Sequence, residues 1–340
     1  MAILQEVVLV AAACASCAGC SFLLLTWKNA EAPNYVSRRI VTSLGFAGLA
    51  TAVAFAMSPI VNGLDQQHQK HEGWCYVQAL TLQYFYLASY LWTACFAFHL
   101  YQIIVKRNEY PEKLLRVYRG LGWGLPGLIL VYLVLRQLTG HVGVGRADRP
   151  WCWIAVHSTA MDTGDDPLVW QREGALTQFA LFYAPVLCVF VFNVNMYHSI
   201  LKYLHMDPMA SRFRRKVTLY LGILLLCSSW GLVNRLLQFL RADHSPNAFC
   251  GFLESFFDPV QPFLNALAYG TTKHSIEAFK ERCCQNWRWF SSSDDDESSS
   301  IDDTPLLPHR LVADPLDQEF GHYFDQRKTS THHSSKFDTN

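Results

Sequence analysis

The chain has 340 residues and lacks the short motifs of the common enzyme classes. No GxSxG, GxxxxGK or HExxH motif occurs, and no pair of catalytic carboxylates stands in a soluble domain, so an enzyme is not indicated. Although there are 11 cysteines, no CxxC pair is followed by a second pair at zinc spacing. This argues against a structural metal site. An internal repeat is also missing, which argues against the duplicated halves of many secondary transporters.

Strict alternation of apolar and polar residues is absent too, and this disfavours a transmembrane barrel. The chain instead has seven apolar stretches of roughly twenty residues or more, a length that spans a bilayer as a helix. They lie at about 6–27, 38–61, 76–105, 117–137, 174–201, 216–240 and 249–271. Because hydrocarbon cannot hydrogen-bond a bare backbone, each stretch has to cross as a helix. We therefore predict an all-α fold, a bundle of seven transmembrane helices.

Lys and Arg collect in every second connection between these stretches. The first, third and fifth connections and the exit of the last stretch hold most of them. By the positive-inside rule those connections face the cytosol, and the N-terminus lies outside. The first stretch begins almost at Met1 without a basic region or a small-residue cleavage site, so we interpret it as a retained anchor.

Two unlike parts make up the chain. Residues 1–290 form the predicted membrane domain, and residues 291–340 form an acidic, Ser-rich tail with too few aliphatic residues to fold alone. Between 273 and 290 the apolar spacing favours a short amphipathic helix on the membrane surface. Near its end, Cys283 and Cys284 are candidates for S-palmitoylation, the alternative being unmodified thiols.

The tail also carries regulatory signals. Two serine triplets, 291–293 and 298–300, stand beside acidic residues that suit acid-directed kinases. Asp302 with Leu306 and Leu307 has the spacing of an acidic dileucine motif, although such short motifs often match by chance. Kinases, arrestin-like proteins and endocytic adaptors are the partners that this pattern would serve.

Cys75 and Cys152 are the cysteines placed for a disulfide. Cys75 starts the third apolar stretch at its outer end, and Cys152 lies in the outer connection between the fourth and fifth stretches. Both face an oxidising compartment in this topology, so we predict a bridge, with free thiols as the alternative. Trp151 and Trp153 flank Cys152 and form either part of an interfacial aromatic belt or a lid over a pocket.

Ionisable residues within the spans are the next candidates, because burying a charge in a membrane is expensive. Arg235, beside Asn234, falls in the outer half of the sixth stretch, and Glu254 and Asp258 lie one turn apart in the seventh. Arg235 pairing with one of these carboxylates would offset the cost of both. The pair would serve as a structural bridge between helices, as the polar floor of a ligand pocket, or as both.

Proline and polar positions near the inner half indicate where the bundle could move. Pro185 frees a carbonyl in the fifth stretch and permits a kink there. Asn265 and Tyr269 are one turn apart near the inner end of the seventh stretch, where they could hydrogen-bond into the core or simply pack. That stretch has no mid-membrane Lys for a retinal Schiff base, so we expect no cofactor.

Six motifs stand in order at matching helical positions. They are Cys75-Tyr76-Val77-Gln78, Ala88-Ser89-Tyr90-Leu91-Trp92-Thr93, Trp151-Cys152-Trp153, Phe182-Tyr183-Ala184-Pro185, Trp230 with Asn234-Arg235, and the run 263–270. Over roughly 35–280 the chain resembles the slime-mould chemotactic cyclic-AMP receptors and their plant relatives. It departs from them in two places. The run Leu44-Gly45-Phe46-Ala47-Gly48 lacks the Asp usual in the second helix, and Gln102 stands where a basic residue is frequent.

This resemblance implies a G-protein-coupled receptor of the cyclic-AMP-receptor-like class at the plasma membrane, with endosomal cycling. Its partners would be a heterotrimeric G protein, membrane lipids and a small extracellular ligand, with cyclic AMP suggested by the family, and no nucleic acid. Trp230 joins Pro185, Asn265 and Tyr269 as a switch candidate. The alternative is a seven-helix sorting or transporter-like protein that does not couple to a G protein.

The third inner connection is short and basic. It carries Arg212, Arg214, Arg215 and Lys216. These charges set topology and contact lipid headgroups, and they are also the candidate contact for a G protein.

Overall fold

The computed structural model describes residues 2–28, 35–67, 72–108, 110–139, 144–146, 150–154, 174, 176–205, 211–240 and 248–270. In chain order the elements are α1 (Ala2–Lys28), α2 (Tyr35–Ala56), α3 (Ser58–Gln67), α4 (Glu72–Ile104), the 3-10 turn η1 (Pro111–Leu114), α5 (Leu115–Arg119), the π turn η2 (Gly120–Gly124), α6 (Leu125–Leu138), β1 (Val144–Arg146), β2 (Cys152–Ile154), the π turn η3 (Phe179–Tyr183), α8 (Ala184–His205), α9 (Ser211–Leu240) and α10 (Ala248–Gly270).

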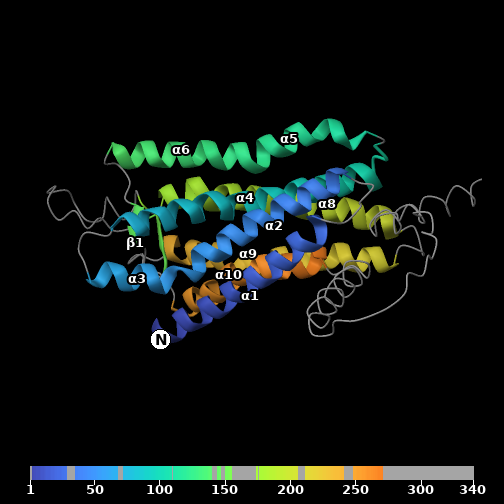
Figure 1. Cartoon of the computed structure of the whole chain (residues 1–340). Helices are drawn as coiled ribbons and strands as arrows, with labels where there is room; N and C mark the ends of the chain where they lie inside the picture. Colours follow the sequence, from blue (N-terminus) through green and yellow to red (C-terminus); the bar gives the residue numbers. More distant parts are fainter. Residues whose placement is uncertain are drawn as a thin grey trace, which may run out of the picture.

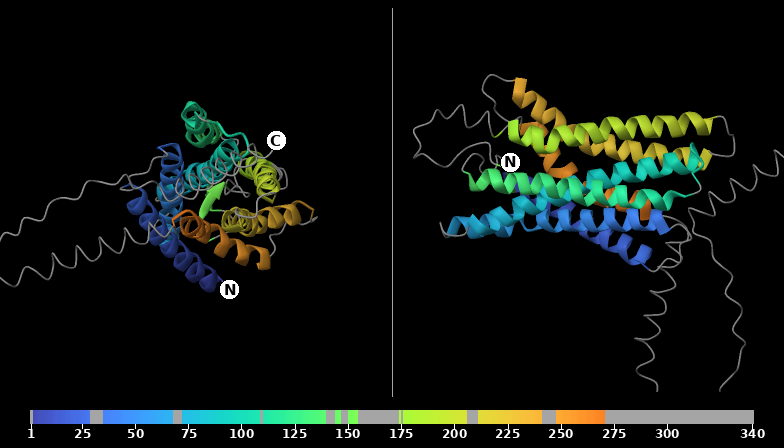
Figure 2. Two further views of the ribbon diagram at one scale, coloured as in Figure 1. Left: turned by 90° about the vertical axis from the view of Figure 1, so that its right-hand side faces the viewer. Right: turned by 90° about the horizontal axis from the view of Figure 1, so that it is seen from above.

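The long helices lie side by side in one bundle, with the β1–β2 hairpin and α3 at the same end (Figure 1, Figure 2). Helix α4 contacts α2, α6 and α8 as well as both strands. In its most apolar window 72% of the residues are buried, against 17% for the helical stretch Pro111–Leu138. Helix α4 is therefore the central helix, and α5 and α6 lie at the edge of the bundle (top in Figure 1).

Six helical stretches among the described residues are long and apolar enough to cross a membrane. They are Ile3–Trp27, Tyr35–Gly63, Gly73–Ile104, Pro111–Leu138, Leu176–His205 and Arg214–Asn234. Each coincides with a predicted span. Helix α10 coincides with the seventh predicted span and has 23 residues, but it is not among these six stretches. The protein is thus a helical membrane bundle.

One face of helix α10 is polar and turned inward. Its polar residues recur every three or four positions and are all buried: Glu254, Asp258, Gln261 and Asn265. Residues at this spacing share a helix face. Helix α10 packs against α1, α2 and α9. It can therefore hold polar groups within the membrane, because neighbouring helices and not lipid surround them.

A hydroxyl from α1 is inserted into the backbone of α10. Ser16 Oγ donates to the carbonyl of Pro259, and the N–H of Phe263 donates to Ser16 Oγ at 3.2 Å. In a regular helix that N–H and that carbonyl would bond to each other directly. Close packing supports the insertion, since a Cβ on Gly48 of α2 would lie 3.1 Å from Pro262 Cβ. An inserted side chain is a recognised cause of helix bending.

The π turn η2 brings the backbone of the fourth span onto α4. A Cβ built on Gly122 would lie 2.4 Å from Trp92 Cε2, a distance at which something must shift. Trp92 is fully buried. Glycine is therefore required at 122 by the close approach of two helices.

We expect Gly122→Ala to destabilise the protein, because overpacking a filled core costs about 1–3 kcal/mol. The measurement is the midpoint of thermal unfolding of the purified protein in lipid nanodiscs. Gly124→Ala is the matched control, since nothing lies within 4 Å of a Cβ there and the π turn is the same. Equal midpoints for the two variants would contradict the expectation.

Two features differ from the all-α expectation. The connection between the fourth and fifth spans contains a short antiparallel sheet in which Val144 pairs with Ile154 and Arg146 with Cys152. Strands of three residues are too short to show a period in the sequence. The second predicted span is divided at Met57, where α2 ends and α3 begins with Pro59 at its second position. Proline fits a first helical turn and interrupts a longer helix.

Candidate ligand site

The β1–β2 hairpin is fastened over the end of the bundle by covalent and hydrogen bonds. A disulfide joins Cys75 of α4 to Cys152, with the Cα atoms 5.3 Å apart, and this confirms the predicted bridge. The N–H of Cys152 donates to Gln78 Oε1 at 3.1 Å, and Gln78 Nε2 donates to the carbonyl of Ala54 at 2.7 Å. Farther along α3, Asn62 Nδ2 donates to the carbonyl of Pro150 at 2.9 Å. The hairpin is therefore held by α2, α3 and α4 together.

Trp151 and Trp153 turn into the bundle. Both are buried, at 3% and 4% exposed. The ring centroids of Trp151 and Phe55 are 5.2 Å apart, and those of Trp153 and Phe182 are 5.1 Å apart. Such edge-to-face contacts belong to a packed interior and not to an interfacial belt. This position favours the lid interpretation.

A small cavity lies directly beneath this lid. Six aromatic side chains, one leucine and one aspartate line it: Phe55, Tyr86, Trp151, Trp153, Phe182, Tyr183, Leu82 and Asp258. Its free space is about 10 Å³, close to what one water molecule needs. This space is too small for an organic molecule, so the lid or other lining side chains would have to move to admit one.

Buried carboxylates stand beside the cavity on α10. Glu254, 1% exposed, accepts hydrogen bonds from Asn234 Nδ2 at 2.9 Å and from the hydroxyl of Tyr183 at 3.2 Å. Asp258 hydrogen-bonds with the hydroxyl of Tyr86. The two carboxylates therefore connect α10 with α4, α8 and α9. The side chain of Arg235, the predicted ion-pair partner, lies outside the described residues.

The switch candidates occupy different depths of the bundle. Trp230 stacks on Phe257 of α10 at 5.9 Å between centroids. Asn265 is buried, and its Nδ2 donates to none of the residues that the structure describes. Pro185 follows the π turn η3 at the start of α8.

Tyr269 joins four helices in the half of the bundle away from the lid. Its ring lies 4.7 Å from Phe96 of α4 and 4.7 Å from Tyr220 of α9, and its hydroxyl hydrogen-bonds with Tyr197 of α8. Any movement of α10 against its neighbours would have to rearrange this aromatic contact.

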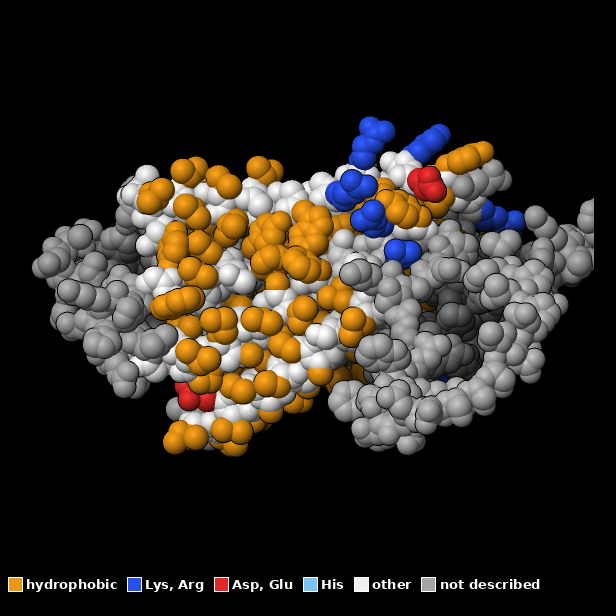
Figure 3. Space-filling model, viewed as in Figure 1, with side chains coloured by type: hydrophobic (Ala, Val, Ile, Leu, Met, Phe, Trp, Pro, Cys, Tyr) orange, Lys and Arg blue, Asp and Glu red, His pale blue; other side chains and the backbone are white. Residues whose placement is uncertain are grey.

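Basic side chains gather at the end of the bundle where α5 lies (Figure 3). Arg215 is exposed there, Lys216 is half-buried, and Arg214 Nη1 approaches the carbonyl of Leu204 at 3.5 Å. The side chain of Arg212 lies outside the described residues. This end is opposite the lid.

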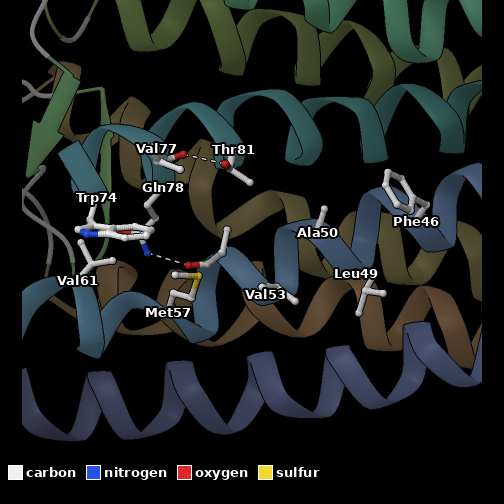
Figure 4. A pocket seen from close by; sticks show the side chains of 11 residues that line it. Phe46, Leu49, Ala50, Val53, Met57, Val61, Trp74, Val77, Gln78 and Thr81 are labelled. Carbon is white, nitrogen blue, oxygen red and sulfur yellow. Dashed lines mark hydrogen bonds between the residues drawn. The ribbon is translucent and has the colours of Figure 1, made fainter.

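A second, larger hollow opens on the side of the bundle between α2, α3 and α4 (Figure 4). Its volume is about 290 Å³, and Val53, Trp74 and Val77 on its rim are about half exposed. The amide nitrogen of Gln78 and the hydroxyl of Thr81 already donate to backbone carbonyls. The hollow therefore suits hydrocarbon better than a polar ligand, and the lid cavity is the better candidate site.

Sequence reasoning named the lid and the acids but missed their partners. Gln78, Tyr86 and Tyr183 were not singled out for the site, although each holds the lid or a carboxylate. One signal was available for Gln78, because an amide inside an apolar span has to find hydrogen-bond partners. The tyrosines had no such signal, since tyrosine packs in helical cores without special cause.

Several sequence predictions fall beyond these elements. The amphipathic segment 273–290, the lipidation candidates Cys283 and Cys284, and the sorting candidates Asp302, Leu306 and Leu307 all lie outside the described residues. No group of three or more His, Cys, Asp or Glu that could hold a metal ion occurs in the described part of the chain.

A membrane bundle with a disulfide-tethered lid, a polar site beneath it and a basic opposite end has the features of a cell-surface receptor. The model of the slime mold cyclic AMP receptor family matches residues 2–270. The chain belongs to this family.

Individual relatives are distant. Cyclic AMP receptor 4 of Dictyostelium discoideum is 27% identical over 257 residues, which cover 70% of this chain and 52% of that protein. G-protein coupled receptor 1 of Arabidopsis thaliana is 26% identical over 224 residues, covering 61% of this chain and 62% of that protein. Cyclic AMP receptor 2 of Dictyostelium discoideum is 26% identical over 250 residues, covering 70% of this chain and 60% of that protein. The aligned parts thus span between half and two thirds of these relatives.

Proposed function

We propose that the protein is a G-protein-coupled receptor of the cyclic-AMP-receptor-like class. The observation that carries the proposal is the small site beneath a disulfide-tethered lid in a chain that belongs to this receptor family. The site lies at one end of the bundle and the basic surface lies at the other. A receptor requires such a separation, because ligand and cytosolic partner must favour the same arrangement from opposite sides.

The orientation follows from the charges. Arg214, Arg215 and Lys216 would face the cytosol by the positive-inside rule, and the lid and the N-terminus would face outward. An extracellular lid agrees with its disulfide, since disulfides persist in oxidising compartments. The protein would then have seven spans, with α10 as the last, and would reside in the plasma membrane.

The ligand would be a small extracellular molecule that displaces the lid. Several relatives carry cyclic AMP in their names, so cyclic AMP is the first compound to test. Inside the cell, the partner would be a heterotrimeric G protein that contacts the basic end. Tail kinases, arrestin-like proteins, adaptors, endosomal cycling and lipidation at Cys283 and Cys284 stay predictions from the sequence.

We expect the double variant Arg214→Ala with Arg215→Ala to reduce GTP exchange on a co-purified Gα several-fold. Complementary charges at the edge of an interface speed the association of the two proteins. The effect should shrink as salt rises. The double variant Arg116→Ala with Arg119→Ala, exposed on α5 at the same end, is the matched control for loss of basic charge.

An epitope tag on the N-terminus first has to show that both variants keep the wild-type orientation, because these charges also set topology. Equal losses in the two correctly oriented variants would assign the effect to overall charge. If the wild-type protein supports no exchange on any Gα, the alternative of a non-coupling sorting or transporter-like protein is favoured.

A further inference from the structure

Gln83 is a buried amide in the middle of the site with a partner on either side. It is 1% exposed. Its Oε1 accepts a hydrogen bond from Trp153 Nε1 of the lid at 3.0 Å, and its Nε2 donates to the carbonyl of Leu181 at 3.0 Å. An indole nitrogen only donates and a carbonyl only accepts, so these two partners fix the orientation of the amide. One side chain of α4 thus bonds both the lid and the segment that leads into α8.

The carbonyl of Leu181 cannot have its usual α-helical donor. In a regular α-helix its donor would be the N–H four residues later, and that residue is Pro185, which has none. The segment is also wound as a π turn, in which the N–H of Ala184 donates to Phe179, five residues earlier. Gln83 therefore supplies a hydrogen bond that the local sequence has removed.

The π turn η3 is the point where lid, α4 and α10 meet α8. Phe182 lies under the Trp153 ring, and Tyr183 donates to Glu254 of α10. Single π turns within α-helices are frequent at functional sites. A change in the lid can reach this turn through ring contacts or through the Gln83 amide.

We propose that Gln83 is the positioning residue that couples the lid to the first turns of α8. When the lid moves outward, Trp153 withdraws its N–H and Gln83 Oε1 is left as a buried acceptor without a donor, which is costly. The Gln83 amide then turns to find a new donor, and the carbonyl of Leu181 loses its hydrogen bond from Gln83 Nε2. The position of the lid and the winding of η3 therefore change together, because both depend on the orientation of the Gln83 side chain. The proposal rests on the proposed function only in naming a ligand as the agent that moves the lid.

Hydrogen–deuterium exchange of the purified protein in nanodiscs tests this link without ligand or G protein. Trp153→Phe keeps an aromatic ring against Phe182 but removes the N–H, and Gln83→Met keeps the side-chain length but removes both bonds. We expect each variant to speed exchange of the amides at 179–187 by about fivefold or more. The double variant should exchange no faster than Gln83→Met alone, because both changes break one path.

Thr81→Val is the matched control on α4, since its hydroxyl bonds only to Val77 of its own helix, and it should leave 179–187 unchanged. Unchanged exchange in Trp153→Phe would overturn the proposal, and so would a double variant whose effect is the product of the two single effects. The second outcome would mean that the lid acts on α8 through ring packing.

The same variants separate this link from the receptor proposal. Ligand-free GTP exchange on a co-purified Gα should change in Gln83→Met relative to Thr81→Val if the link carries the signal. If neither the wild type nor any variant supports GTP exchange, that result counts against the G-protein coupling. The hydrogen–deuterium exchange of the single and double variants would still decide the role of Gln83.

Discussion

Replacing Cys152 with serine is expected to cost about 4 kcal/mol of unfolding free energy and to leave little protein at the cell surface. The disulfide spans 77 residues of sequence, and closing a loop of that size restricts the unfolded chain by about this amount. Thermal unfolding of the purified protein, with and without reductant, measures the change. Surface display of an N-terminal tag measures its consequence in cells.

Cys188→Ser is the matched control, because Cys188 is a free and exposed cysteine on α8. Reductant should lower the unfolding midpoint of the wild type and of Cys188→Ser but not that of Cys152→Ser. A wild-type midpoint that ignores reductant, with the bridge shown to be cleaved, would mean that the hydrogen bonds of Gln78 and Asn62 hold the lid unaided.

Replacing Asn234 with leucine is the second change for which we expect a large effect. It removes the 2.9 Å hydrogen bond to Glu254, a side chain almost wholly withdrawn from solvent. Hydrogen bonds to charged groups contribute about 1.5–3 kcal/mol, and a buried acceptor that loses its donor adds to the cost. We expect the free energy of unfolding to fall by about 2–3 kcal/mol and expression to fall with it.

Asn195→Leu tests whether this cost belongs to the carboxylate. Asn195 is an exposed residue of α8 whose amide bonds only to Val191 in its own helix, so its loss should be nearly neutral. The companion variant Tyr183→Phe removes the other described donor to Glu254 and should destabilise in the same direction. Similar stabilities for Asn234→Leu and Asn195→Leu would show that Glu254 is satisfied by other groups.

Some parts of the site could be predicted from the sequence before the fold was known, and others could not. Cys75 and Cys152 could be paired from the predicted topology, which puts Cys75 at the end of a span and Cys152 in the connection on the same side of the membrane. Glu254 and Asp258 could be noticed because carboxylates in apolar stretches are costly. Their donors could not be named, since Asn234 is 20 residues and Tyr183 71 residues from Glu254.

Local chemistry explains what the chain by itself determined. Each span is defined by the length of an apolar run, and the orientation is predicted from the distribution of Lys and Arg. These are sums over neighbouring residues and need no knowledge of packing. The described helices accordingly begin and end within a few residues of the predicted limits in most cases. The 3-10 and π turns that open the fourth and fifth spans escaped prediction, because their hydrogen-bond register leaves little trace in apolar sequence.

Only the tertiary structure decided how the site is closed and connected. Burial of Trp151 and Trp153 depends on where a loop folds back between helices, and the sequence left both the belt and the lid open. The bonds of Gln83 join α4, the lid and the start of α8, which are separated by 70 and 98 residues. Such contacts come from the geometry of the whole bundle, because a buried amide takes whichever partners the packing brings within reach.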